Sequence, residues 1–408
     1  MYRFLTFLLF FPSITFGLYS SEVFPWGVIF SAFYLRHITK EMLMIIILMG
    51  ISCSFVILTN IFYEGLLNTD VIRSLAAYMN FLLMSQTLLI LGQKRAFEIT
   101  LLSRNIFWLL IIIGFIQIIG SDILGSFIQF FVPRGEGNAL VEINRGVTLL
   151  ATEPARAGVE LTLIYLIYRI SQTHSNKHIL IDLFVIIFQA LIIKSASAMA
   201  FTIGAFGIMH FRFNTRLFTI VTTTIFAISL IFFVVYILPE MGGRAGDVVL
   251  FLKDTDLASD AIFYIANESG NRLIALYSFI ISGFYSPFGY GIGSWTYSSI
   301  IAFNESGLDY RDFRFFDVVG NGQLIAFRGP GVISNLMLDL GLFGTILIFY
   351  LFRKMMLRYA EFSDFSKKAF WIFLFKIAFF GSPGNPIVFI FFMVVFLTTA
   401  QKNKSIYT

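Results

Sequence analysis

Long apolar runs follow one another along almost the whole chain, and no other feature of the sequence limits its fold as strongly. A helix needs about 20 mostly apolar residues to cross a bilayer, and runs such as 42–62, 217–239 and 332–352 meet that length. Hydrophobic residues make up 58% of the chain and charged residues 13%, with a mean hydropathy of +0.83. A soluble core does not need that much apolar surface. The sequence therefore predicts an all-α polytopic membrane protein in which residues 1–408 form a single integral membrane domain.

About twelve helical segments of this kind are expected along the chain. The tetrapeptide KSAS (194–197) separates two of them, and the glycine- and proline-containing GSPGNP (381–386) separates the last two. The expected segments are 3–19, 24–36, 42–62, 75–92, 105–120, 158–170, 179–193, 198–210, 217–239, 332–352, 369–381 and 386–400.

Basic residues gather in every second connector between these segments. RHITK (36–40), QKRAFEITLLSR (93–104) and RISQTHSNKH (169–178) are examples. Since the cytoplasmic connectors of membrane proteins are rich in Lys and Arg, this pattern predicts that both termini lie in the cytoplasm. Two segments that are too long to be turns, 121–157 and 240–331, would then be loops on the outer side.

Cysteine and histidine are scarce, which limits the chemistry available to the outer loops. The single cysteine, Cys53, excludes an intrachain disulfide framework and a cysteine-based metal cluster. In the predicted topology His37, His174, His178 and His210 all lie on or near the inner side. An outer site would therefore have no histidine base, and we expect neither a metal nor another cofactor there. The net charge of +5 is ordinary for a membrane protein and gives no indication of nucleic-acid binding.

Arginine dominates the positive charge of the expected outer segments. These segments contain nine arginines and two lysines, whereas the inner ones contain nine arginines and eight lysines. The planar guanidinium group binds phosphate and carboxylate in a fixed geometry, so the bias indicates an anion site. The alternative is a set of salt bridges to loop acids, which the run Arg311, Asp312, Arg314 and Asp317 would suit.

In the first outer loop, Arg145 and Arg156 flank an expected helix start. Thr152, Glu153 and Pro154 combine a capping hydroxyl, an acid and a first-turn proline. The helix N-terminus carries a partial positive charge, and an anionic headgroup at the bilayer surface could bind there beside Arg156. The alternative reading of Glu153 is an acid that interacts only with the helix dipole.

In the second outer loop, Arg272 begins an expected amphipathic helix, and Gly283 follows ten residues further on. A glycine- and aromatic-rich turn comes next at 288–293. Glycines let a backbone approach a ligand closely, and an aromatic ring such as Tyr290 could stack on a sugar. A tight turn without a ligand would look the same.

The end of this loop and the following span contain further polar candidates. Arg328 closes the loop, and Asn335 and Asp339 lie four residues apart on one face of the next helix. With no histidine available, a base would have to be a carboxylate, for which Glu153 and Asp339 are the main candidates. Weaker candidates are Glu142, Asp254, Asp256, Asp260 and Glu268.

Taken together, this layout resembles the O-antigen polymerases, the Wzy family. The resemblance rests on about twelve spans, two long outer loops with arginines, and the Arg272-x10-Gly283 spacing. A span that begins near Asn335 and continues with GLFG (341–344) also fits.

The stretch from Arg145 through 152–154 is similar to the first-loop motif of that family. It departs from the motif at the glycine, because Gly158 follows Arg145 with twelve residues between them instead of ten. The role of Arg145 is therefore less closely matched than that of Arg272.

The resemblance implies a GT-C-like, metal-independent inverting glycosyltransferase in the bacterial inner membrane, with its active site facing the periplasm. Its substrates would be undecaprenyl-diphosphate-linked oligosaccharides, and a chain-length regulator protein would be a partner. Carried onto this chain, it implies diphosphate and substrate binding by Arg145, Arg156, Arg272, Arg328, Tyr290 and Asn335, and catalytic roles for Glu153, Asp339 and Arg272.

Two other functions fit a chain of this kind. The related O-antigen ligases have a histidine just before the asparagine of the later span, and this chain has Ser334 there. A lipid-linked oligosaccharide flippase would place charges inside the helical bundle, where Lys376 stands almost alone. The serine at position 334 and the scarcity of charges inside the bundle both favour the polymerase over these alternatives.

Overall fold

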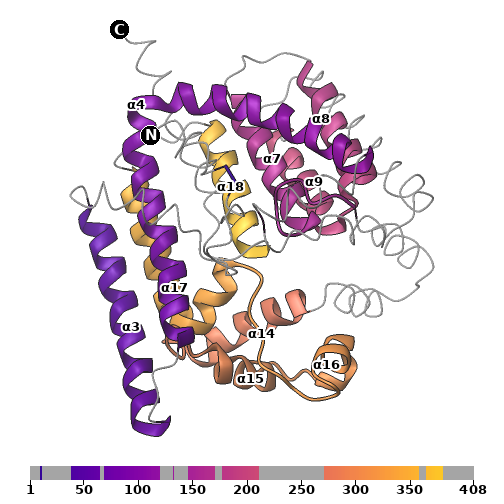
Figure 1. The fold of residues 1–408 in the computed structure, drawn as a ribbon. Helices are drawn as coiled ribbons and strands as arrows, with labels where there is room; N and C mark the ends of the chain where they lie inside the picture. The colour runs from indigo at the N-terminus through magenta and orange to yellow at the C-terminus, as the bar shows by residue number, and fades with distance from the viewer. Residues whose placement is uncertain are drawn as a thin grey trace.

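A computed structural model of the chain describes residues 10–11, 38–64, 69–119, 132, 146–170, 177–210, 271–357 and 364–379 (Figure 1). Within these ranges the protein is helical and contains no strand. Three helical stretches are long and apolar enough to cross a membrane, namely Lys40–Leu58, Ile99–Ile119 and Val332–Met355. The described part is therefore that of an all-helical membrane protein. The predicted spans at 24–36, 217–239 and 386–400 lie outside the described residues, as does most of 3–19.

Helices α3 (Lys40–Glu64) and α4 (Thr69–Ile119) pack against each other, and α3 also packs against α17 (Val332–Leu357). In Figure 1, α4 rises near these two helices and then turns across the top of the bundle toward α8. The predicted connector at 93–104 is instead helical, because α4 is helical from Thr69 to Ile119. That stretch contains no glycine or proline and is rich in good helix formers such as Gln, Lys, Arg, Ala and Leu.

Helices α7 (Pro154–Ile170), α8 (Lys177–Phe188) and α9 (Ala196–His210) form a second group, with the short π-helix η2 (Gln189–Ile193) extending α8. The predicted break at KSAS is confirmed, since Lys194 ends η2 in the left-handed region with φ 50°. The buried Gln189 ties the group together. Its Nε2 donates to Thr162 Oγ1 at 2.7 Å and to Thr202 Oγ1 at 2.6 Å.

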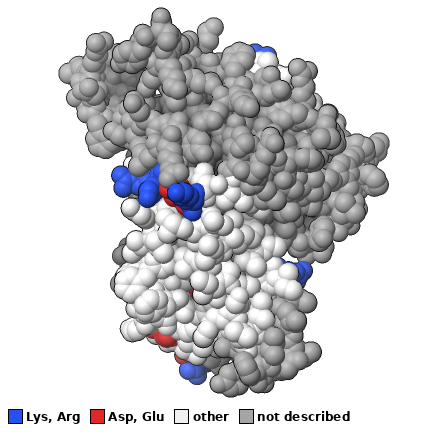
Figure 2. Space-filling view, turned by 90° about the vertical axis from the view of Figure 1, so that its left-hand side faces the viewer, with Lys and Arg blue, Asp and Glu red and all other residues white. Residues whose placement is uncertain are grey.

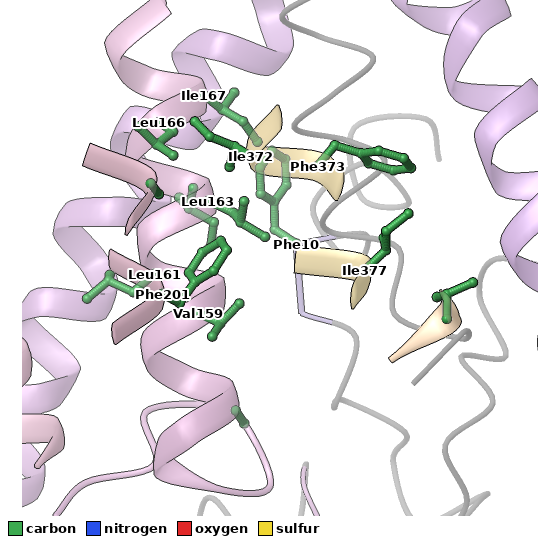
Figure 3. Packing of buried hydrophobic residues seen from close by; sticks show 14 of the residues in the cluster. Phe10, Val159, Leu161, Leu163, Leu166, Ile167, Phe201, Ile372, Phe373 and Ile377 are labelled. Carbon is green, nitrogen blue, oxygen red and sulfur yellow. The ribbon is translucent and has the colours of Figure 1, made fainter. Parts of the chain in front are cut away.

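Helix α18 (Asp364–Phe379) fills the space between this second group and α17. Figure 3 shows the apolar contact, with Leu166 and Ile167 of α7 on the side toward Ile372 of α18. The ring of Phe201 of α9 stacks on that of Phe375 of α18, with centroids 5.8 Å apart. Such interdigitated, fully buried side chains hold helices at fixed positions along one another. As a result, the C-terminal end of α18 lies at the same end of the bundle as the start of α7.

Residues 271–331 of the second predicted loop form short helices and turns. They contain α14 (Asn271–Tyr285), α15 (Trp295–Glu305), the 3₁₀ turn η4 (Tyr310–Asp312) and α16 (Arg314–Val319), which we call the cap. Its core is aromatic: the rings of Phe279 and Phe327 stack with centroids 5.5 Å apart, and Phe303 meets Phe316 edge-on at 5.2 Å. The cap lies across the beginning of α17 (Figure 1), and the helix expected at Arg272 is confirmed as α14.

Candidate functional site

The first and second predicted loops meet where α7 and α14 begin. The Arg272 guanidinium donates from a terminal nitrogen to Glu153 Oε2 at 3.2 Å, across 119 residues of sequence. Both side chains remain open to solvent, at 43% exposure for Arg272 and 57% for Glu153. An exposed pair of this kind contributes only about 0–1 kcal/mol to stability. The ion pair therefore marks the place where the two segments meet, but it contributes little to keeping them together.

The segment that presents Glu153 is held by backbone contacts. Gln117, near the end of α4, accepts from the Leu149 amide at 2.9 Å and donates to the Leu149 carbonyl at 3.0 Å. Val147 N–H donates to the Ile192 carbonyl of η2 at 3.1 Å. A Cβ on Gly146 would lie 2.2 Å from the Ile193 carbonyl oxygen, so only glycine fits. The segment is thus fixed between α4 and η2.

One helical turn beyond the start of α7 lies a buried group of charges. Arg156 and Glu160 are four residues apart and so share a face of α7. Lys376 of α18 is only 2% exposed, and the charges of Arg156 and Glu160 both act on its ammonium group. Lys376 is therefore enclosed by the protein. The neighbouring carbonyl of Ala378 lies against Gly331, since a Cβ there would come within 2.3 Å of its oxygen.

Arg328 and Asp339 occupy the same region between the cap and α17. The Arg328 guanidinium lies over the Trp295 ring, 4.4 Å from its centroid, in a cation–π contact. The charge of Arg328 also acts on Asp339 and on Tyr78. Tyr78 donates its hydroxyl hydrogen to Asp339 Oδ2 at 2.8 Å, and the Gly293 amide also bonds to this carboxylate. Asp339 is therefore an enclosed carboxylate.

Asn335 uses its side-chain amide on the backbone that follows Arg328. Its Nδ2 donates to the carbonyls of Gly329 at 3.1 Å and Gly331 at 2.5 Å. Asn335 and Asp339 do share one helix face, but the asparagine amide shapes the 329–331 segment in this structure.

The glycine-rich turn is packed against a break in α17. Gly341 has φ 65° and ψ −169°, so the helical hydrogen bonds are interrupted there. The Tyr290 and Gly291 amides donate instead to the carbonyls of Leu338 at 3.0 Å and Asp339 at 2.8 Å. Gly289 has φ +72°, and a Cβ on it would lie 2.5 Å from the Asp339 backbone. These glycines allow the backbone of the turn to approach α17 closely.

Tyr290 faces Glu305, a carboxylate that is not among the candidates predicted from the sequence. Its hydroxyl donates to Glu305 Oε1 at 2.7 Å, and Ser282 donates to Glu305 Oε2 at 2.6 Å. Burial raises the pKa of the Tyr290 phenol, and the hydrogen bond to Glu305 adds to this rise. Tyr290 thus remains a hydrogen-bond donor at neutral pH. The available signal for Glu305 was a single acid at the end of the apolar stretch WTYSSIIAFNE.

The salt-bridge reading fits Arg311. Its guanidinium contacts Asp309 at 2.7 Å, and its side chain is 75% exposed. The Arg311 hydrogen bonds hold the pKa of Asp309 below its ordinary value.

The predicted site residues thus form two neighbourhoods at one end of the bundle. Glu153, Arg156 and Arg272 lie around the start of α7, and Arg328 with Asp339 lies at the start of α17. Arg145 falls outside the described residues. Within the described ranges, no group of three or more His, Cys, Asp or Glu side chains could hold a metal ion.

Comparisons with models of known protein families, with curated proteins and with solved structures gave no match.

Proposed function

We propose that the chain is an O-antigen polymerase of the Wzy type. In this proposal it is a GT-C-like, metal-independent inverting glycosyltransferase of the bacterial inner membrane. It transfers a growing glycan from undecaprenyl diphosphate to the non-reducing end of a new lipid-linked repeat unit. The observation that supports it most is the contact between Glu153 and Arg272, because it unites the two arginine-bearing segments that the resemblance singles out.

The arginines would bind the diphosphate of the donor. Arg272 is exposed and held by one carboxylate at 3.2 Å, so an anion of higher charge can displace Glu153 from it. Arg156 lies in the first turn of α7, where the helix dipole also favours an anion. Negative charge grows on the diphosphate as the glycosidic bond breaks, and fixed guanidinium groups stabilise it. Arg145 and Arg328 would complete this set.

The exchange at Arg272 also suggests how a base is made available. While Glu153 is paired with Arg272, the guanidinium occupies one of its carboxylate oxygens. When the diphosphate takes its place, Glu153 is free to accept the proton of the acceptor hydroxyl. The hydroxyl oxygen then attacks the anomeric carbon, the bond to the diphosphate oxygen breaks, and the configuration inverts. Asp339 is enclosed by Tyr78 and Gly293, so a role in holding the start of α17 suits it better.

The same proposal includes the finer features of the topology. About twelve helices would span the membrane, with both termini in the cytoplasm and the Glu153–Arg272 contact facing the periplasm. Tyr290 and Asn335 would shape the sugar-binding side through Glu305 and the 329–331 segment. A chain-length regulator would act as a separate partner protein.

The test is the lipopolysaccharide pattern of a bacterial strain that lacks this gene, complemented with the wild type, with Arg272→Ala or with Arg311→Ala. We expect a ladder of long polymer with the wild type and with Arg311→Ala, because Arg311 is a solvated ion pair with Asp309. With Arg272→Ala we expect a single repeat unit on the lipid core at unchanged protein level. Loss of that single repeat in the deletion strain would overturn the proposal in favour of a ligase or a flippase. Accumulation of lipid-linked polymer would then select the ligase.

A further inference from the structure

Three exposed cations gather at the end of the bundle opposite the cap. Lys40 is the first residue of α3, and Arg353 and Lys354 lie in the last turns of α17. The two helices meet there, because Lys354 Nζ lies 4.0 Å from Glu41 Oε1. Figure 2 shows Lys and Arg side chains grouped around an acidic one on this face, at the border of a broad white area. We call Lys40, Arg353 and Lys354 the basic cluster.

The surface beside the basic cluster is a continuous apolar stripe. On α3 it begins three residues after Lys40, and on α17 it ends three residues before Arg353. Its exposed side chains are Leu43, Met44, Ile47, Ile51, Phe55 and Leu58 on α3, and Phe343, Ile346, Leu347 and Tyr350 on α17. From Leu43 to Leu58 the stripe is about 22 Å long at 1.5 Å per residue. That is most of the roughly 30 Å thickness of a bilayer core.

Among the described residues, the basic cluster has more positive charge than the negative charge beside it. In the described ranges, the carboxylate within ion-pair distance of the cluster is the buried Glu41, which lies near Lys354. Lys354 reaches Glu41 only at the limit of an ion pair, and its side chain stays 54% exposed. Lys40 and Arg353 are exposed as well. A phosphate is the anion that suits ammonium and guanidinium groups at a membrane border.

We propose that the basic cluster binds the headgroup phosphate of an anionic phospholipid whose acyl chains lie along the apolar stripe of α3 and α17. Headgroup and tails would then be recognised by adjacent parts of one surface. Because the three cations come from helices more than 300 residues apart, the lipid would also hold the start of α3 to the end of α17. This site is separate from the proposed polymerase site, which lies at the other end of α17, and it does not depend on that function.

The test uses the purified full chain in mixed micelles that contain either phosphatidylglycerol or phosphatidylcholine. Retained lipid is counted by native mass spectrometry, and the melting temperature is followed as lipid is added. We expect the wild type to retain phosphatidylglycerol selectively and to be stabilised by it, and both effects to weaken with salt. Each single change among Lys40→Gln, Arg353→Gln and Lys354→Gln should lower the affinity about five-fold. The triple variant should lose the selectivity altogether.

The matched control neutralises Arg311 and Arg314, which are exposed cations of the cap. The variant Arg311→Gln/Arg314→Gln should retain phosphatidylglycerol as the wild type does. Equal retention of the two lipids by the wild type would overturn the proposal, and so would undiminished selectivity in the triple variant. An acidic protein segment as the true occupant would produce the first of these results. If the triple variant fails to fold, the graded losses of the three single variants decide the question.

Discussion

An acidic side chain lies at each end of helix α7, and the two differ in burial and in hydrogen bonding. At its C-terminal end, Asp182 of α8 is completely buried and accepts hydrogen bonds from Tyr165 at 2.6 Å and Arg169 at 3.2 Å, with His210 2.6 Å away. At its N-terminal end, Glu153 is mostly exposed, and its contact among the described residues is with Arg272 at 3.2 Å. The saturated carboxylate can only hold helices together, whereas the open pair can exchange its partner for a ligand. Asp182 therefore has a structural role at one end of α7, whereas Glu153 belongs to a candidate binding site at the other end.

The largest expected effect is on stability and comes from Asp182→Ala. It leaves the partly buried Arg169 without its counter-charge and removes the acceptor of Tyr165, which should cost about 3 kcal/mol or more. The melting temperature in detergent and the amount of folded protein in the membrane would both fall. Polymer yield should fall only in proportion to protein level. An unchanged melting temperature would contradict the structural role of Asp182.

The reverse pattern is expected for Arg272→Ala. Removal of an exposed pair should change stability by about 1 kcal/mol or less, while loss of a charge that stabilises the leaving diphosphate should lower polymerisation about a hundred-fold or more. Melting temperature and polymer per unit of protein are measured on the same preparation. A loss of stability as large as that of Asp182→Ala would show that the contact between Arg272 and Glu153 is also structural, and it would contradict the comparison.

A smaller effect is expected from Lys376→Met, which removes a buried charge and keeps much of the side-chain volume. Removing one charge from a buried group is destabilising, but Arg156 remains beside Glu160, so we expect the melting temperature to fall less than with Asp182→Ala. Because Arg156 and Glu160 would lose a neighbouring charge, polymerisation should fall about ten-fold, and Lys376→Arg should restore part of it. Full activity of Lys376→Met would limit the binding site to exposed arginines.

The smallest effect concerns Tyr290→Phe, which removes one hydrogen bond to a carboxylate and should cost about 1–2 kcal/mol. The folded-state pKa of Tyr290 is raised, so its stabilising effect is complete below the ordinary value of 10 and is lost as pH rises above it. The wild type should therefore lose stability more steeply than Tyr290→Phe in the interval above about pH 10. Melting curves across this interval would show it, and parallel curves would contradict it.

The sequence alone determined most of the helices. Apolar runs at 42–62, 158–170 and 332–352 correspond to α3, α7 and α17, and KSAS marks the break before α9. These features depend on local hydrophobicity and backbone preference, which a sequence displays directly. The same local view failed at 93–104, where charge was taken for a connector although the residues favour a helix.

Only the tertiary structure decided which polar groups meet. The pairing of Glu153 with Arg272 spans 119 residues, and that of Tyr78 with Asp339 spans 261. No local sequence pattern predicts either contact. The same holds for the bonds from Ser282 and Tyr290 to Glu305, and for a glycine turn that packs against α17 at Gly341. Such contacts follow from how apolar faces pack. Packing sets the register between distant helices, and so it determines which polar side chains come within hydrogen-bond distance.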